Sequence, residues 1–452
     1  MVNFLKKICK LNFGEFEDKE FRKFLRLGTL FLLLVGIYWT MRPFKDGIFI
    51  EFVNADEQPW AKLVSLGVML VLVAIYSNLV SRIPKEKLLS IMPAFYGVLT
   101  MLFSIFVFLV QNKTINDKLI VRIIGYSWYV FVESFGSLII ALFWAYASSI
   151  TIAKSAKQGF PLIYALGQVG GILFPLFLIT IPQMYKVQST PLAMAILSFA
   201  MFLPKLLIRY FIKHTPEELR TSTIPTQIEN KEQEKKQKKA SFTDGLKLLL
   251  THKYLFGIFL VNFFFEFVVT IFDFNFKYQV QETIKISTER QAILGWYSVS
   301  VNTVSLIFLL LGVNQITKRI GMGVALACTP VLLLLSLIGF VTMGQLLMFL
   351  LVLMVSSKAI NYALNGPSLK QLYIPTSQEA KSQAQAWIET FGSRSSKVIA
   401  GQCNLLRPVL GTASYIMLGS SLSFLCTGLW LIIAIFLGKT YKKAIDSNSV
   451  IC

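Results

Sequence analysis

The chain alternates long apolar runs with short charged segments. The runs from Leu25 to Trp39, Leu63 to Tyr76 and Leu346 to Val355 are nearly free of charge. An apolar stretch of about 20 residues is long enough to cross a bilayer as a helix. The pattern therefore predicts an all-α polytopic membrane protein with about twelve transmembrane helices. They are expected at residues 25–43, 60–81, 88–110, 121–149, 159–181, 191–212, 254–275, 293–314, 321–342, 345–367, 383–405 and 412–437.

A polar segment at the centre of the chain separates six predicted helices from the other six. It contains the run TQIENKEQEKKQKKA at residues 226–240, which has too few apolar side chains to form a core. We therefore expect a tail at 1–24, a six-helix half at 25–212, a linker at 213–253, a second half at 254–437 and a tail at 438–452. This layout is typical of major-facilitator-like transporters, whose halves rock around a site near the middle of the membrane.

Composition and the distribution of charge agree with this picture. The chain is 55% hydrophobic and carries a net charge of +20, which is too apolar for a soluble protein of this size. Most Lys and Arg residues lie in the tails and in alternate loops, the arrangement that marks the cytoplasmic side of a membrane protein. We therefore expect cytoplasmic termini and no nucleic-acid partner. We expect a monomer in a bacterial inner (cell) membrane, with an organelle membrane as the alternative.

Residues that could support catalysis or hold a metal ion are sparse. The two histidines, His214 and His252, both fall in the linker region, and no nucleophile stands near a base in the sequence. The five cysteines show neither paired nor CxxC spacing, so no disulfide framework or zinc site is predicted. Residues 1–24 contain no apolar run, so we expect the first span, and not a cleavable signal peptide, to direct targeting. The sequence thus predicts neither an enzyme nor a cofactor.

Basic residues inside the predicted spans are the first candidates for function. A charge at membrane depth is costly unless it has a partner, a water-filled cavity or a ligand. Arg42 and Lys45 are three residues apart, as are Arg394 and Lys397, so the two members of each pair share a helical face. Pro43 is expected to break the helix within the first pair. Alternative interpretations are a charged helix end for the first pair and snorkelling toward the cytoplasm for the last pair. The set consists of Arg42, Lys45, Lys358, Arg394 and Lys397.

Acidic residues inside the spans are fewer. Glu133, Glu266 and Asp46 are the candidate partners of the basic residues. Asp273 is a further candidate, and the alternative is that Asp273 and Lys277 mark the outer end of the seventh span. Glu133 either pairs with a basic residue or carries a proton. The excess of cations favours an anionic solute, and a mixture of Arg and Lys suits phosphate groups. From the residues alone we expect a transporter of organic anions or phosphate esters.

Uncharged polar residues accompany these charges at helical spacing. Asn262 shares a face with Glu266, and Asn361 or Tyr362 follows Lys358 by about one turn. Gly366 and Pro367 are expected to end this helix.

The residues at these positions resemble those of the ATP/ADP translocase family, the nucleotide transporters of plastids and obligate intracellular bacteria. The pattern Y-x-x-x-R-x-x-K-D begins at Tyr38, and E-x-x-G-S begins at Glu133. The most specific stretch begins SSKAINYALNGPSLKQLYIP, in which Lys358 is followed by the Tyr-Ile-Pro of residues 373–375, and it ends in the run holding Arg394 and Lys397. The stretch departs from the family pattern at residues 364–371, where the family's Asp and Glu are absent.

The resemblance implies that Lys45, Glu133, Glu266 and Lys358 correspond to the family's four charged transport residues. It implies an exchange of ATP for ADP by alternating access, in which the basic residues bind the phosphates. Aromatic and amide side chains are candidate contacts to the base, namely Trp144, Tyr164, Tyr362, Asn361 and Asn262. Two alternatives remain open, a proton-coupled nucleotide importer that uses Glu133 or Glu266, and a membrane scaffold or receptor without transport activity.

Overall fold

A computed structural model describes residues 17–151, 153–220, 242–311, 321–377, 388, 392–447 and 449–451, and all the regular structure in these ranges is helical. Eleven helices of the described residues are long and apolar enough to cross a membrane. In the first part of the chain they are α2 (Asp18–Phe52), α3 (Gln58–Arg82), α4 (Lys85–Gln111), α5 (Lys118–Ser149), α6 (Ala153–Pro175) with its continuation to Met184, and α8 (Thr190–Ala200) with α9 (Leu203–His214). In the second part they are α13 (Lys253–Thr283), α14 (Ser287–Leu310), α16 (Met322–Met343), α17 (Leu347–Ile360) with its continuation to Leu372, and α22 (Thr412–Asp446).

The prediction of an all-α polytopic membrane protein is confirmed. Eleven of the predicted spans coincide with these helices. The remaining span, at 383–405, falls partly on residues outside the described ranges, and its end forms α20 (Ser393–Asn404). The polar run at 226–240 also lies outside the described residues. Shorter helices are α10 (Glu217–Arg220), α12 (Phe242–Thr251) and α21 (Arg407–Leu410).

The described residues fall into two compact units. The first comprises residues 1–57, 63–223 and 280–306, and the second comprises residues 58–62, 224–279 and 307–452. The first turn of α3 therefore packs in the second unit, and most of α14 packs in the first. The division into two halves of six helices stays a prediction.

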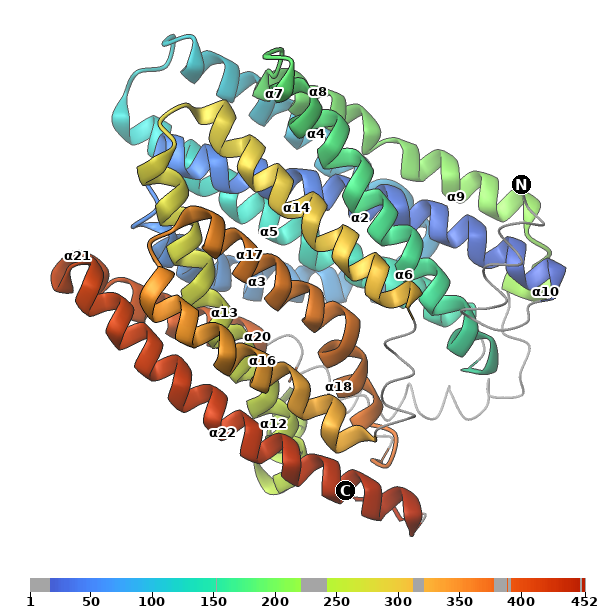
Figure 1. Cartoon of the computed structure of the whole chain (residues 1–452). Coiled ribbons are helices and arrows are strands. Elements are labelled where there is room, and N and C mark those ends of the chain that lie inside the picture. The colour runs from blue at the N-terminus through green and yellow to red at the C-terminus, as the bar shows by residue number, and fades with distance from the viewer. Residues whose placement is uncertain are drawn as a thin grey trace. The chain divides into compact units, whose positions relative to one another are not determined.

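In the first unit, α2 packs along α6 and also contacts α5 and α9 (Figure 1). A close approach of backbones makes this packing possible. A Cβ atom added at Gly170 of α6 would lie 2.0 Å from the carbonyl oxygen of Leu32 on α2, so only glycine fits there. Small residues at such crossings let membrane helices associate without a hydrophobic driving force.

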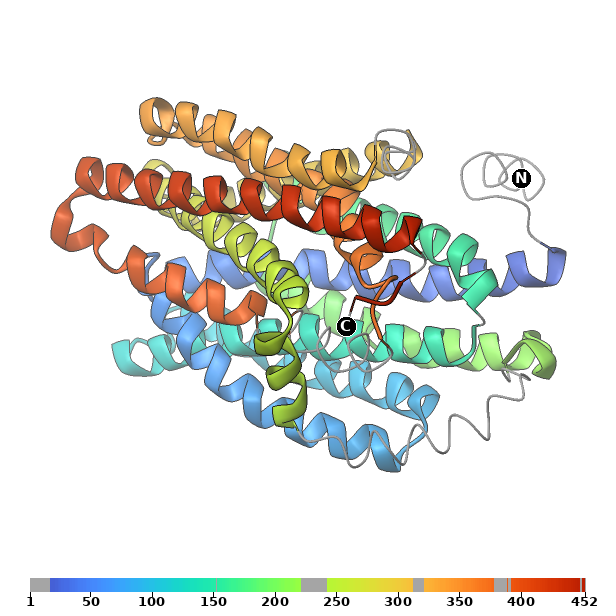
Figure 2. The ribbon, with the colours of Figure 1, turned by 90° about the horizontal axis from the view of Figure 1, so that it is seen from below.

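In the second unit, α16 and α22 run side by side (Figure 2). Their crossing point is Gly323 on α16 and Gly438 on α22, where an added Cβ at Gly438 would lie 2.3 Å from the Cα of Gly323. The α17 continuation also contacts α16. Small residues thus set the closest contact in this unit as well.

Two predicted helix breaks are wrong. The helix α2 continues through Pro43, and residues on both sides of it are helical. The chain also continues past Gly366 and Pro367, because a π-helical turn at Asn361–Asn365 leads directly into α18 (Gly366–Leu372). Proline removes one hydrogen bond, and membrane helices tolerate this loss where neighbouring helices or a π-helical turn satisfy the freed carbonyl group.

The helix ends also differ from the prediction. The helix α2 begins seven residues before the predicted span at 25–43 and ends nine residues after it. Hydropathy detects the part of a helix that is apolar, whereas the backbone remains helical as long as its hydrogen bonds continue. This extension places Lys45 and Asp46 inside a helix rather than in a loop.

Candidate substrate-binding site

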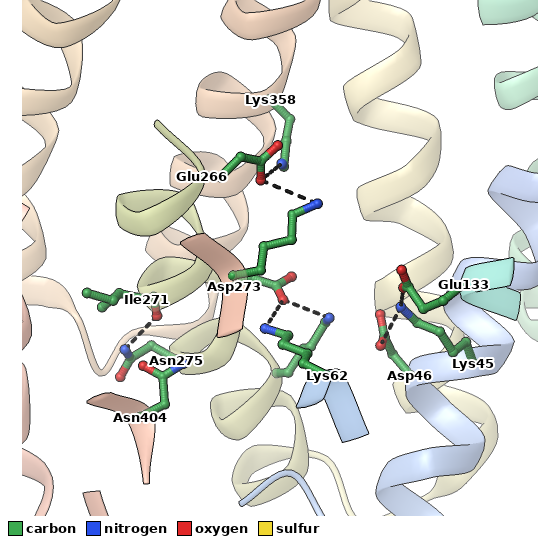
Figure 3. A network of polar contacts seen from close by, with 12 residues as sticks. Lys45, Asp46, Lys62, Glu133, Glu266, Ile271, Asp273, Asn275, Lys358 and Asn404 are labelled. Atoms are coloured by element: carbon green, nitrogen blue, oxygen red, sulfur yellow. Dashed lines mark hydrogen bonds and ion pairs between the residues drawn. The ribbon is translucent and has the colours of Figure 1, made fainter. Parts of the chain in front are cut away.

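The first unit contains a buried cluster of opposite charges. Lys45 on α2 donates a hydrogen bond of 2.5 Å to Glu133 on α5 and lies 3.6 Å from Asp46 (Figure 3). Its ammonium group is also 4.4 Å from the ring centre of Tyr129, which belongs to the same face of α5 as Glu133. Only 4% of Lys45 is exposed. The alternative of an exposed, positively charged helix end is therefore wrong for Lys45.

Gly136 positions the two helices that carry this cluster. A Cβ atom at this residue of α5 would lie 2.2 Å from a ring carbon of Tyr38 on α2. Because glycine leaves this space open, the tyrosine ring packs directly on the α5 backbone, one turn from Glu133. Arg42, the next basic residue of α2, stacks over Trp39 with its guanidinium carbon 4.6 Å from the ring centre. Tyr38 and Gly136 therefore form the helix contact beside the ion pair, while Arg42 packs on aromatic rings of its own helix.

Aromatic side chains gather further along α5 and α6. Trp144 and Tyr164 stack with their ring centres 4.6 Å apart and an interplanar angle of 27°. Phe31 and Phe160 meet Trp144 edge-on at 5.1 and 5.2 Å. Tyr164 is 44% exposed, so one partner of the stacked pair remains accessible. The structure thus brings together two of the residues predicted as base contacts.

The second unit contains a cluster of similar composition. Glu266 on α13 lies 3.6 Å from the ammonium group of Lys358 on α17 and 3.5 Å from that of Lys397 on α20 (Figure 3). Lys358 also approaches the ring of Phe265, at 5.2 Å from its centre. The side chains of Glu266 and Lys358 are 13% and 12% exposed, and that of Lys397 is 42% exposed. Lys397 therefore extends toward a carboxylate, which differs from the snorkelling alternative.

Backbone contacts fix α20 against α13 at this cluster. Ser396 donates a hydrogen bond of 2.5 Å to the carbonyl oxygen of Phe263, and Asn262 donates one of 3.2 Å to that of Ile388. The amide group of Asn262 is therefore engaged with the backbone of Ile388, which precedes α20. Arg394, also on α20, is half-buried and precedes Lys397 by three residues.

The π-helical turn after α17 holds the remaining predicted residues. Asn365 donates a hydrogen bond of 2.8 Å to the side-chain oxygen of Asn361, and Asn365 is buried. Tyr362, on the same turn, is 40% exposed. Single π-helical turns inside α-helices occur frequently at functional sites. This turn begins three residues after Lys358.

A third charged cluster was predicted only in part. Asp273 on α13 lies 2.8 Å from Lys277 on the same helix and 3.7 Å from Lys62 in the first turn of α3 (Figure 3). The seven-residue spacing places Glu266 and Asp273 on one face of α13, so Asp273 was a candidate anion, and the alternative was a marker of the helix end. Lys62 could not be assigned to them, because the contact joins segments far apart in the sequence.

No group of three histidine, cysteine, aspartate or glutamate residues within the described part of the chain could hold a metal ion. The chemistry available to the clusters is therefore that of ammonium groups, guanidinium groups and carboxylates. Ammonium groups that share a carboxylate can bind an anion if the anion replaces the carboxylate as their partner. Such clusters inside membrane helices mark the pathways of substrates and ions.

Solved structures of transporters share this fold. A bacterial homologue of the iron transporter ferroportin in an inward-facing state superposes with a TM-score of 0.63 over 92% of this chain and 99% of that one, at 12% identity. The nucleoside transporter NupG superposes with a TM-score of 0.59 at 13% identity, over 91% of this chain and 99% of that one. The likeness and the eleven apolar helices of the described residues define the fold of a multi-pass membrane protein.

Relatives in sequence narrow this class. The family model described as TLC ATP/ADP transporter matches residues 4–441. ADP,ATP carrier protein 1 of Rickettsia typhi is 23% identical over 99% of this chain and 98% of its own length. ADP,ATP carrier protein 3 of Rickettsia bellii is 21% identical over 88% of this chain and 90% of its own length. The chain belongs to the TLC ATP/ADP transporter family.

Proposed function

We propose that this protein exchanges ATP for ADP across a membrane by alternating access. The family of the chain and the names of its rickettsial relatives support a nucleotide as the substrate. The observation that carries the proposal is the pairing of Lys45 with Glu133 and of Lys358 with Glu266, because each pair buries a cation whose partner an anionic substrate can replace. The same four positions carry the resemblance in the sequence.

In the proposed mechanism, the carboxylates and the substrate phosphates alternate as partners of the lysines. Without substrate, Glu133 pairs with Lys45, and Glu266 is shared by Lys358 and Lys397. The phosphates then take over the lysines, and Arg42 and Arg394 supply planar guanidinium groups for further phosphate oxygens. The two sets of ion pairs stabilise different states of the carrier, as a transport cycle requires.

The base is proposed to bind through stacking. Trp144 and Tyr164 already form a stacked pair with an accessible tyrosine face, and stacking of a base on an aromatic side chain contributes about 1–3 kcal/mol. Tyr362 and Asn361 on the π-helical turn are further candidates. Asn262 is a weaker one, because its amide group already binds the backbone of Ile388.

We further propose cytoplasmic termini, a linker on the cytoplasmic side and a location in the inner membrane of a bacterial cell. The basic tails and linker support this orientation. The exchange would then respond to the membrane potential. ATP carries about one more negative charge than ADP, and one elementary charge moved through 100 mV corresponds to about 2.3 kcal/mol.

Counter-flow in proteoliposomes tests the proposal. The purified chain is reconstituted into vesicles loaded with ADP, ATP, GTP or buffer, and uptake of labelled ATP is followed with and without a proton ionophore. We expect uptake only into nucleotide-loaded vesicles, with the highest rate for internal ADP and no loss with the ionophore. Uptake that ignores the internal nucleotide and disappears with the ionophore would instead establish proton-coupled import.

The scaffold alternative is tested with the same vesicles. Lys358→Gln should abolish uptake while the protein still inserts and purifies as a folded carrier. If wild-type vesicles take up no nucleotide under any loading condition, the transport proposal is wrong.

A further inference from the structure

Two charge clusters of the same composition lie on one face of α13. Each consists of one carboxylate and two lysines: Glu266 with Lys358 and Lys397, and Asp273 with Lys277 and Lys62. The two carboxylates are seven residues apart, which is about two helical turns and about 10 Å along the axis. Figure 3 shows the two clusters one beyond the other along α13.

The cluster around Asp273 is enclosed by protein. The side chains of Lys62, Asp273 and Lys277 are 12%, 15% and 6% exposed. Asp273 and Lys277 lie in a helix rich in phenylalanine, and Lys62 reaches them from α3. A helix end that only marked the membrane surface would expose these groups to water. Ionisable groups buried in membrane helices are rare, so this cluster is a candidate for function.

The position of Lys62 depends on how the first turn of α3 is held. Gln58 and Ala61 are fully buried, and Pro59 packs on α20, where a Cβ atom at Gly401 would lie 3.6 Å from Pro59. This turn therefore belongs to the second unit, although the rest of α3 packs in the first. The packing brings a lysine to Asp273 that α13 itself does not supply.

We propose that Lys62, Asp273 and Lys277 form a second phosphate-binding site on α13, two turns beyond the Glu266 cluster. This inference rests on the proposed function for the identity of its ligand, the phosphate chain of a nucleotide. Lys62 passes to the incoming phosphate more readily than Lys277, since its contact with Asp273 is longer, at 3.7 Å against 2.8 Å, and therefore weaker. Asp273 competes with the phosphate for both lysines and so permits its release.

Two substitutions of opposite charge test the site. Lys62→Gln removes a cation, so the KM for ATP should rise roughly tenfold and inhibition by inorganic tripolyphosphate should weaken by a similar factor. Asp273→Asn removes the competing carboxylate, so ATP and tripolyphosphate should both bind more tightly while the exchange rate falls. Lys62→Arg keeps the charge and should keep most of the affinity.

The matched control is Lys285→Gln, an exposed lysine just beyond the end of α13, which should leave all these values unchanged. All variants are compared at equal amounts of inserted protein. A purely structural role for the cluster predicts that Lys62→Gln and Asp273→Asn change affinity in the same direction. That result, or an unchanged affinity for tripolyphosphate in Lys62→Gln, would overturn the proposal.

Direct binding of tripolyphosphate to the purified protein separates this proposal from the proposed function. If wild-type vesicles exchange nucleotides but Lys62→Gln binds tripolyphosphate normally, only the second site is wrong. If wild-type vesicles exchange no nucleotide but Lys62→Gln weakens tripolyphosphate binding and Asp273→Asn strengthens it, the transport proposal fails and the phosphate site stands.

Discussion

Replacing Glu266 with glutamine should make the carrier bind ATP more tightly and exchange it more slowly. In the proposed mechanism a phosphate must separate Glu266 from Lys358 before it can bind. The 3.6 Å distance of this pair corresponds to about 4.6 kcal/mol of Coulomb attraction at an effective dielectric constant of about 20. Once the two charges are separated, water and other partners stabilise each of them, so the net energy of the pair is smaller than this value. Measured coupling energies between residues of one salt-bridge network are about 0.5–3 kcal/mol, which is the more realistic scale.

The contribution of the second pair should be small. Lys397 is 42% exposed, so solvent screens its interaction with Glu266 to about 1 kcal/mol or less. The expected change in ATP affinity is therefore estimated from the Glu266–Lys358 pair alone. Removing the carboxylate charge should lower the dissociation constant for ATP by about 10- to 100-fold, since about 1.4 kcal/mol corresponds to a factor of ten. The exchange rate should fall because release becomes slower.

Equilibrium binding of labelled ATP to the purified variant measures the affinity, and counter-flow in proteoliposomes measures the rate. Glu282→Gln is the matched control, because Glu282 is an exposed carboxylate at the far end of the same helix. It should change neither value. If Glu266→Gln folds normally but binds ATP more weakly than the wild type, carboxylate and phosphate do not compete for Lys358, and the mechanism is refuted.

Three further predictions concern the first unit. Lys45→Gln leaves Glu133, whose side chain is 31% exposed, without its hydrogen-bonded cation and should destabilise the protein by about 1–3 kcal/mol, measured by thermal unfolding in detergent. Combining Lys45→Glu with Glu133→Lys should recover part of this stability, and failure to do so would show that the pair is not the cause. Gly136→Ala should lower the free energy of unfolding by about 1–3 kcal/mol, because the added methyl group overlaps the ring of Tyr38 on α2. Gly67→Ala is the control and should leave this energy unchanged, because a Cβ atom at Gly67 would have no atom within 4 Å. Trp144→Ala should weaken the binding of ATP and ADP equally, by about 1–3 kcal/mol in competition assays, since stacking involves the base alone; a loss that depends on the number of phosphates would contradict this role.

The sequence determined the class of fold and most of the helices. Spans such as those of α4 and α22 are evident because about 20 apolar residues in a row have no other stable arrangement than a membrane helix. The sequence also indicated that Lys45, Glu133, Glu266 and Lys358 matter, because a charge at membrane depth is costly and needs a reason. Helix ends were less predictable, as in α2, since hydropathy reports the surroundings of a helix and not its hydrogen bonds.

The tertiary structure alone decided which charges meet. Lys45 and Glu133 are 88 residues apart and Lys62 and Asp273 are far more distant, so no periodicity in the sequence could pair them. The contact between Tyr38 and Gly136 also depends on tertiary structure, because the space beside a glycine is filled only when a second helix packs there. Ion pairs act over a few ångströms, and helix packing sets those distances. The sequence therefore supplied the charges, and packing arranged them into clusters of one carboxylate and two lysines on α13.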